Sequence, residues 1–313
     1  MPPDPAPLPV FHHEALLYRG LEEFVAETVS FVDDGLRADQ PVLVAVSQPK
    51  IGLLREALGG RSDRVVFADM AELGRNPARL IPAWRRFAEE HAANPAGLRG
   101  VGEPIWPQRS AAELAESQRH EALVNLAFAG APQLRLLCPY DLDALDGAVI
   151  DEARHSHPFV RAAGASSASP GFAGSGRAAP YDRPLAEPPA PSPPFEFDAD
   201  SLGELRDLVH ARGVAAMLRE PHLSDLVLAV GEIAANSVRH GGGRGVLRTW
   251  TPPGELVCEI RDRGHIADPL AGRWEPPADA VGGRGLWIAN QLCDLVEVRS
   301  STEGSTIRLH VRT

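Results

Sequence analysis

Residues 162–194 have a composition unlike that of the rest of the chain, and they constrain the fold most. Their sequence, AAGASSASPGFAGSGRAAPYDRPLAEPPAPSPP, is almost entirely alanine, glycine, serine and proline. Such a stretch buries too little apolar surface to offset the entropy that ordering costs, and its proline-rich second half favours an extended backbone. We therefore expect a linker at 162–194 between two domains, residues 1–161 and residues 195–313, that reorient independently.

Patterns typical of helices and of buried strands alternate before this linker. Helical periodicity extends over 21–36, 50–58, 77–92 and 110–129, with Ser110 as a candidate N-cap. Short apolar, β-branched runs occupy 41–47, 64–70, 98–106 and 134–141. This alternation predicts an N-terminal α/β domain with a mainly parallel sheet.

The carboxyl ends of the predicted strands carry polar and aromatic residues, and ligands bind at that edge of parallel sheets. The residues are Ser47, Asp69, Glu103, Trp106, Tyr140 and Asp141. Two interpretations stay open: these side chains line a pocket for a small-molecule signal, or they are the polar loops that follow any strand. A nucleotide pocket is not expected here, because the loop SQPKIGLL lacks the GxxxxGK[ST] pattern that cradles phosphates.

The histidines and cysteines of the chain show no metal-binding spacing. None of the N-terminal histidines has a cysteine or carboxylate at the distance typical of zinc sites, so we expect surface or helix-capping histidines. The histidines concerned are His12, His13, His120, His155 and His157. The three cysteines, Cys138, Cys258 and Cys293, form no CxxC pair and are expected to be reduced thiols in apolar cores.

Several segments of the N-terminal half carry a family resemblance. They are HHEALLYRGLEEFV, FADMAELGRNPARLIPAW, GVGEPIWP, QRHEALVNLAF and LLCPYD. Over roughly residues 10–160 they resemble the MEDS sensory domain of bacterial regulators. The resemblance implies a sensor of a signal, and it does not name the ligand.

The sequence after the linker changes character. Helical patterns cover 201–218 and 223–241, and strand patterns cover 245–251 and 255–262 with a Pro-Gly turn between them. The segment 282–294 begins with glycines and continues as a helix, and 295–301 and 305–313 form a closing hairpin. Helices on one face of a mostly antiparallel sheet predict an α+β two-layer sandwich.

The segment GEIAANSVRHGGG places Glu232, Asn236 and His240 at steps of four residues. Each step advances the side chain about 40° around a helix, so the three share a face. An amide oxygen and a carboxylate on one stripe suit a hydrated Mg²⁺ and a general base, and a solvent-facing polar stripe is the alternative. His240 is expected to act at the helix C-terminus, where glycines 241–243 stop the helix.

Three further motifs follow in order. Asp262-x-Gly264 ends a strand, so that the carboxylate can accept from an exocyclic amine and the glycine admits a flat ring. The glycines of GGRGLW, residues 282–287, open a helix whose free N–H groups suit a phosphate. Gly304 to Thr306 begin the last strand. Each motif is common alone, and their joint order on helix, strand end, helix start and strand start is specific.

The series ExxxN, DxG, GxGL and GST resembles the nucleotide-binding boxes of the GHKL, or Bergerat-fold, ATPases over roughly residues 198–313. The resemblance implies binding of ATP with Mg²⁺. It assigns the general base to Glu232, the Mg²⁺ ligand to Asn236, adenine recognition to Asp262 with Gly264 and Thr306, and the phosphate-lid positions to Gly283, Gly285 and Leu286. Arg284 either contacts a phosphate or is solvated, and residues 265–282 form a short ATP lid. Ile266 stands where the fuller DxGxG box has a second glycine, which puts the adenine pocket or lid hinge in doubt.

Within that superfamily the compact module, with EIAANSVRHG followed by GRGLWIANQLCD, resembles the actinobacterial anti-sigma factor serine kinases. That resemblance implies regulation of transcription by partner switching, with a sigma factor and a STAS-type anti-sigma-factor antagonist as partners and the antagonist as the phosphorylated protein. One alternative is a nucleotide-dependent binding module without phosphotransfer. A less favoured one is a histidine-kinase-like transmitter, for which His210 is the nearest candidate acceptor.

Charge and hydropathy exclude other classes. The net charge of -11 and the pI of about 5.5 argue against a direct nucleic-acid partner, which requires a basic face. No apolar run approaches the roughly 18 residues of a membrane helix, and the N-terminus lacks the pattern of a signal peptide. We expect a cytoplasmic protein.

Overall fold

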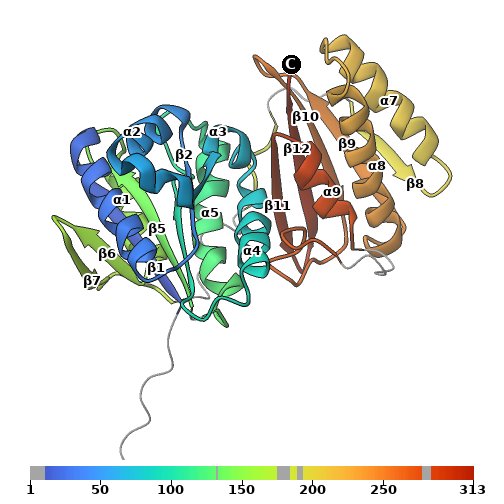
Figure 1. The fold of residues 1–313 in the computed structure, drawn as a ribbon. Coiled ribbons are helices and arrows are strands. Elements are labelled where there is room, and N and C mark those ends of the chain that lie inside the picture. The colour runs from blue at the N-terminus through green and yellow to red at the C-terminus, as the bar shows by residue number, and fades with distance from the viewer. Residues whose placement is uncertain (1–10, 132, 175–183, 189–192, 277–282) are drawn as a thin grey trace, which may run out of the picture. The chain divides into compact units, whose positions relative to one another are not determined.

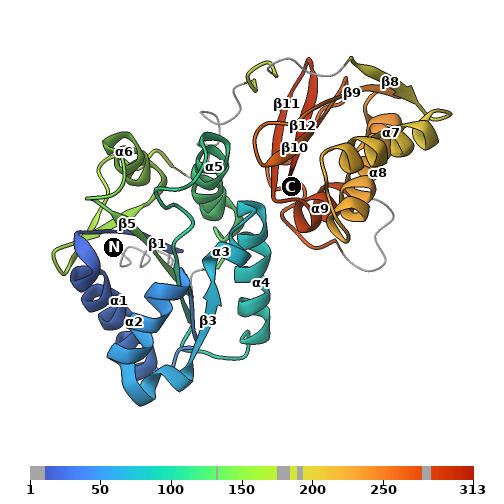
Figure 2. The ribbon, with the colours of Figure 1, turned by 90° about the horizontal axis from the view of Figure 1, so that it is seen from above.

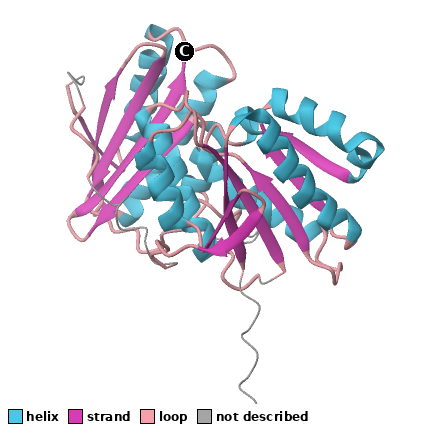
Figure 3. Ribbon diagram, turned by 90° about the vertical axis from the view of Figure 1, so that its left-hand side faces the viewer, coloured by secondary structure: helices cyan, strands magenta, loops and turns pink. Residues whose placement is uncertain are grey.

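The computed structural model describes residues 11–131, 133–174, 184–188, 193–276 and 283–313. The chain divides into two compact units, Met1–Ala178 and Ala179–Thr313 (Figure 1). Each unit combines one β-sheet with several helices (Figure 3).

The N-terminal unit is built on a seven-stranded sheet with the order β3-β2-β4-β5-β1-β6-β7. The strands are β1 (His12–Tyr18), β2 (Val42–Val46), β3 (Val65–Asp69), β4 (Leu98–Gly102), β5 (Leu134–Asp141), β6 (Phe159–Ala162) and β7 (Ala165–Ala168). Every neighbouring pair is parallel except β6 with β7. The predicted, mainly parallel sheet is therefore confirmed, although β1, which lies between β5 and β6, was not expected.

Helices cover both faces of this sheet (Figure 2). They are α1 (Gly20–Arg37), α2 (Gln48–Leu58), α3 (Met70–Leu73), α4 (Leu80–Glu90), α5 (Ala111–Ala127) and α6 (Gly147–Ser156), with 3-10 turns at Gly59–Arg64 and Pro77–Arg79. Ser110 caps α5 in a capping box with Glu113. Gly100 and Gly102 of β4 make room for the indole of Trp84 in α4, since a Cβ at either would lie 2.8 Å from the ring.

The linker differs from the expectation at its start. β7 lies within 162–194 and pairs antiparallel with β6, so the first residues of the predicted linker belong to the N-terminal sheet. Ala163 and Gly164, both with positive φ, form the tight turn of this hairpin. Ser169 extends the attachment, because its hydroxyl donates to the Arg154 carbonyl at 2.6 Å. Parts of the predicted linker, 175–183 and 189–192, lie outside the described residues.

The C-terminal unit is the predicted α+β two-layer sandwich. Its strands are β8 (Phe195–Asp198), β9 (Arg244–Trp250), β10 (Glu255–Asp262), β11 (Leu295–Ser301) and β12 (Gly304–Arg312). They pair antiparallel throughout, in the order β11-β12-β10-β9-β8. Helices α7 (Leu202–Ala215), α8 (His222–His240) and α9 (Gly285–Leu292) pack against one face of the sheet (Figure 1). The short edge strand β8 was not predicted.

One apolar core joins α8 to the sheet and fixes the rotation of the helix. Leu226, Val230 and Ile233 are fully buried in the same cluster as Ile260 and Leu309 of the sheet. These apolar residues recur at helical spacing, so the remaining face of α8 is left for polar side chains.

The opposite face of this sheet carries a network of ion pairs. Arg308 donates to Glu259 at 2.6 Å in the middle of the face. His310 lies between Glu255, at 3.2 Å, and Glu297, at 3.0 Å. Burial alone would lower the pKa of His310, but its hydrogen bonds to the two carboxylates outweigh burial and raise the pKa to about 9.

The three cysteines are buried free thiols, as expected. In the parts of the chain that the structure describes, no helix is both long enough and apolar enough to cross a membrane.

Candidate functional site

The polar stripe of α8 lies at the edge of the apolar core. Glu232 and Asn236 are partly buried, whereas His240, the last residue of the helix, is exposed. The helix ends there, and Gly241 donates its N–H to the Ser237 carbonyl at 2.7 Å. Glycines 241–243 thus stop the helix and lead into β9, as the sequence predicts.

Asp262, the last residue of β10, is held in place by both of its carboxylate oxygens. The Ser237 hydroxyl of α8 donates to Oδ2 at 2.6 Å, and the Gly264 N–H donates to Oδ1 at 2.7 Å. A carboxylate offers about four acceptor positions, so each oxygen retains one for a further donor. Two hydrogen bonds therefore fix the orientation of the Asp262 carboxylate, and one of them comes from Ser237, the neighbour of Asn236 in the sequence.

Glycines bring the remaining motifs against these two side chains. A Cβ on Gly285, the first residue of α9, would lie 2.4 Å from Asn236 Nδ2. A Cβ on Gly304, the first residue of β12, would lie 2.3 Å from the Asp262 carbonyl oxygen. At such distances a larger residue would force the neighbouring atom to move, namely the Asn236 amide at Gly285 and the backbone of Asp262 at Gly304. The four motifs therefore meet at one place in the C-terminal unit.

The hydroxyl at the start of β12 that faces this site belongs to Ser305 and not to Thr306. Ser305 pairs with Asp262 across the strands, and its hydroxyl donates to the Gly264 carbonyl at 2.8 Å. Thr306 pairs with Arg261 and alternates with the core residue Ile307, so it lies on the opposite face of the sheet. The geometry favours Ser305 in the place where the sequence pointed to Thr306.

The N-terminus of α9 fits the role expected of the glycine motif. Gly283 has a φ of +78°, and Arg284 follows as the N-cap without a side-chain cap from any described residue. The first turn of the helix closes where the Ile288 N–H donates to the Arg284 carbonyl at 2.8 Å. The earlier N–H groups, those of Gly285 and Leu286, belong to the unpaired first turn, where anions bind. Gly282 lies outside the described residues.

The first half of the predicted lid is anchored to neighbouring elements. Ile266, at the position of the missing glycine, donates its N–H to the Ser300 hydroxyl at 2.8 Å. The Gly272 carbonyl accepts from the Asn290 amide of α9 at 3.0 Å. The later part of the lid, 277–282, lies outside the described residues, so the expected ordering of the whole loop on nucleotide binding stays a prediction.

The strand ends of the N-terminal unit form a different kind of site. Glu103 is buried and accepts from the Tyr18 hydroxyl at 3.1 Å and from the Lys50 ammonium. Burial raises the pKa of Glu103, and the nearby Lys50 opposes that rise. Asp69 caps α3 by accepting from the Ala71 N–H at 2.9 Å. These polar side chains bind one another and the backbone, so their contacts favour the structural interpretation over a pocket.

Two family models match separate parts of the chain. Residues 12–158 match the family model of the MEDS, or MEthanogen/methylotroph, DcmR Sensory domain. Residues 195–311 match the model of the histidine kinase-like ATPase domain. The chain joins a MEDS domain to a histidine kinase-like ATPase domain.

More distant comparisons add little to this assignment. No curated protein matches the chain. The crystal structure of the RsbU and RsbW domains of Rv1364c from Mycobacterium tuberculosis is similar at 20% identity and a TM-score of 0.29. The similarity covers 39% of this chain and 33% of that one. A similarity of this size carries no argument about activity or partners.

Two polar residues of the ATPase domain site were not identified from the sequence. The sequence does not single out Ser237, because a helical serine usually bonds to its own helix, and its hydroxyl does lie 3.2 Å from the Ile233 carbonyl as well. The GST motif contains two adjacent hydroxyl residues, Ser305 and Thr306. The sequence alone does not decide which of them faces the site, because it does not set the register of β12.

Proposed function

We propose that the ATPase domain binds ATP with Mg²⁺ and transfers the γ-phosphoryl group to a serine or threonine of a partner protein. The partner class is a STAS-type antagonist of an anti-sigma factor, and a sigma factor is the second partner. The MEDS domain makes this activity responsive to a signal. One observation carries the proposal: Asn236, Asp262 and Gly285 meet at one site.

The residues present fit a nucleotide with its metal. Asp262 retains acceptor positions for the exocyclic amine of adenine. Gly264 beside it lets the strand end pack against the end of α8, since a Cβ there would lie 2.9 Å from the His240 carbonyl. Asn236 would hold Mg²⁺ through its amide oxygen, and the bound ion would neutralise charge on the phosphates. The first turn of α9, from Gly285, would bind a phosphate.

Glu232 is proposed as the general base. It lies one helical turn before Asn236 and is partly buried on the same stripe. In the proposed reaction Glu232 accepts the proton of the attacking hydroxyl, while the other residues position the nucleotide.

Binding is tested by calorimetry of ATP–Mg²⁺ with the full-length protein. Asn236→Ala is expected to lose about 10- to 100-fold in affinity, the range for one hydrogen bond or ligand to a charged group. Arg239→Ala is the matched control, because Arg239 is exposed on the same helix. Equal affinity of Asn236→Ala and the control would remove Asn236 from the site.

Transfer is tested separately with labelled ATP and purified STAS-type proteins. Glu232→Gln keeps the shape of the side chain, so it is expected to bind ATP and fail to label the partner. Full labelling by Glu232→Gln would remove Glu232 as the base.

The same experiment distinguishes the other two functions. Nucleotide-dependent capture of the partner without any label would identify a binding module. Acid-labile phosphate would identify a histidine-kinase-like transmitter. His210 has an exposed side chain on α7, which packs against α8. If His210 accepts the phosphoryl group, His210→Asn abolishes labelling; if another residue accepts it, labelling persists.

A further inference from the structure

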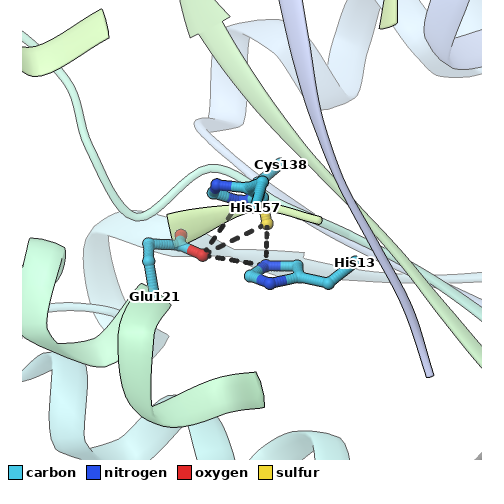
Figure 4. A group of neighbouring side chains, drawn as sticks. All are labelled: His13, Glu121, Cys138 and His157. Atoms are coloured by element: carbon cyan, nitrogen blue, oxygen red, sulfur yellow. Dashed lines mark hydrogen bonds and ion pairs between the residues drawn. The ribbon is translucent and has the colours of Figure 1, made fainter. Parts of the chain in front are cut away.

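Four side chains that bind metals in proteins converge in the core of the MEDS domain (Figure 4). His13 comes from β1, Glu121 from α5 and Cys138 from β5, and His157 directly follows α6. None of the four is more than 5% exposed. The histidines His13, His120 and His157 are thus buried, contrary to the expectation of surface positions, although His157 does cap α6.

Four of the six distances between the potential ligand atoms are close to those of a tetrahedral metal site. Glu121 Oε2 lies 3.0 Å from His13 Nε2, 3.3 Å from His157 Nε2 and 3.5 Å from Cys138 Sγ. His13 Nε2 lies 3.3 Å from Cys138 Sγ. In a tetrahedron with Zn–N near 2.05 Å and Zn–S near 2.3 Å, neighbouring ligand atoms are about 3.3 to 3.6 Å apart. All four ligand atoms lie within 4.8 Å of one another.

The hydrogen bonds around the two histidines direct their lone pairs to this point. His157 Nδ1 lies 2.8 Å from the Ala153 carbonyl, which only accepts, so Nδ1 carries the proton. His13 Nδ1 lies 3.1 Å from Asn125 Oδ1, and the orientation of that amide is fixed because its nitrogen donates to the Ser156 carbonyl at 2.7 Å. Both Nε2 atoms therefore present a lone pair to Glu121, and both rings have the outer hydrogen bond that metal-binding histidines usually make.

Protonation alone does not pair all the polar atoms of this group. If one imidazole is protonated at Nε2, it donates to Glu121, but the Nε2 lone pair of the other imidazole still faces the same buried carboxylate. His157 Nε2 and Glu121 Oε1 have no hydrogen-bond partner in the described part of the chain. Buried polar atoms are rarely left unpaired, because each such atom costs free energy. A dication bound by all four side chains removes this conflict.

We propose that His13, Glu121, Cys138 and His157 bind one Zn²⁺ ion in the core of the MEDS domain. Two imidazoles, a thiolate and a carboxylate are all ligands that zinc accepts, and four protein ligands define a closed structural site. A cavity of about 10 Å³ adjoins His13, Glu121 and Cys138 and is otherwise lined largely by apolar side chains such as Trp84 and Leu136. That volume is at the lower limit for one water molecule.

The site would cross-link segments that lie far apart in the sequence. It links β1 and β5 to α5 and to the segment that leads from α6 into β6. On binding, the Cys138 thiol releases its proton to solvent and binds as the thiolate. Because the metal binds the folded domain, its removal is expected to destabilise that domain.

The first experiment measures metal in the full-length protein as purified, by inductively coupled plasma mass spectrometry. About one zinc per chain is expected, and ZnCl₂ is expected to restore this content after treatment with a chelator. Replacement by Co²⁺ is expected to give visible d–d bands and a thiolate-to-cobalt charge-transfer band in the near ultraviolet, and the latter reports directly on Cys138. Chelation is expected to lower the thermal midpoint by about 5 °C or more.

Matched variants test the four ligands. Cys138→Ser is expected to lose the charge-transfer band, while Cys258→Ser, a buried cysteine of the ATPase domain, keeps it. Glu121→Gln and His157→Asn are expected to weaken Co²⁺ binding at least 10-fold, while the neighbouring His155→Asn leaves it unchanged.

The result that overturns the proposal does not require any variant to fold. Wild-type protein that is isolated without metal, and that binds neither Zn²⁺ nor Co²⁺ after reduction of its thiols, would show a hydrogen-bonded polar cluster only. Retention of the cobalt–thiolate band in Cys138→Ser would equally remove the assignment.

Discussion

Substituting Gly285 by alanine tests whether the close contact between α9 and α8 positions Asn236. The new Cβ would lie 2.4 Å from Asn236 Nδ2, whereas ordinary van der Waals contact begins near 3.4 Å. The amide must therefore retreat by about 1 Å, which is the difference between these two distances. A ligand displaced by that amount loses most of its interaction, so we expect ATP–Mg²⁺ affinity to fall about 10- to 100-fold.

Stability is expected to change little in this variant. The obstructing atom is the end of a side chain, and alanine is intrinsically no less favourable than glycine in a helix. The Glu232 carbonyl, 3.3 Å from the new Cβ, has to move only by a few tenths of an ångström. Thermal melting therefore separates lost binding from lost folding.

Calorimetry of the single and double variants decides the mechanism. If Gly285→Ala acts through Asn236, the double variant with Asn236→Ala binds no more weakly than Asn236→Ala alone. Additive losses, or wild-type affinity in folded Gly285→Ala, would refute the reasoning. Gly203→Ala in α7 is the matched control, since no described atom lies within 4 Å of a Cβ there.

Two further predictions concern the sheet of the ATPase domain. Ser305→Ala is expected to weaken ATP binding about 5- to 10-fold, because the Gly264 carbonyl loses its hydrogen bond. Thr306→Val is expected to leave the ATP affinity unchanged. The reverse order of affinities in calorimetry would contradict the pairing of β12 with β10. His310 has a pKa raised from 6.5 to about 9, so its contribution to stability is present below pH 6.5 and is lost as the pH rises through about 9. The free energy of unfolding in urea should therefore fall by about 3 kcal/mol over that range in the wild type, and His310→Gln should lack this fall; equal pH profiles would exclude the ion pairs as its cause.

The sequence predicted the elements whose patterns are periodic and missed those whose patterns are not. The helices α1, α5 and α8 and the strands β2 and β5 lie within a few residues of their expected positions. β1 was missed because its first three residues, HHE, are polar although the strand is largely buried, so it lacks the continuous apolar run that indicated β2. Its polar side chains are accommodated by partners far along the chain, such as Arg161, which lies 3.3 Å from Glu14. No local pattern indicates such partners.

The convergence of the four motifs was predictable because each motif is contiguous in the sequence. Glycine, asparagine and aspartate occur at fixed spacings within each short motif. Such a spacing can be recognised in the sequence without the tertiary structure. What the motifs leave open is the pairing of strands. A shift of one residue moves a side chain to the other face of a sheet, so the choice between Ser305 and Thr306 required the pairing of β12 with β10.

The four residues of the proposed zinc site could not be brought together from the sequence. His13 and Cys138 are 125 residues apart, and the fold brings them together because Ala15 pairs with Cys138 across β1 and β5. That pairing depends on β1, a central strand that the sequence did not reveal. His157 reaches the cluster because the chain turns from α6 into β6, which also pairs with β1. Metal sites assembled by sheet topology leave no short spacing, so isolated polar residues in a poorly periodic segment are where such ligands should be sought.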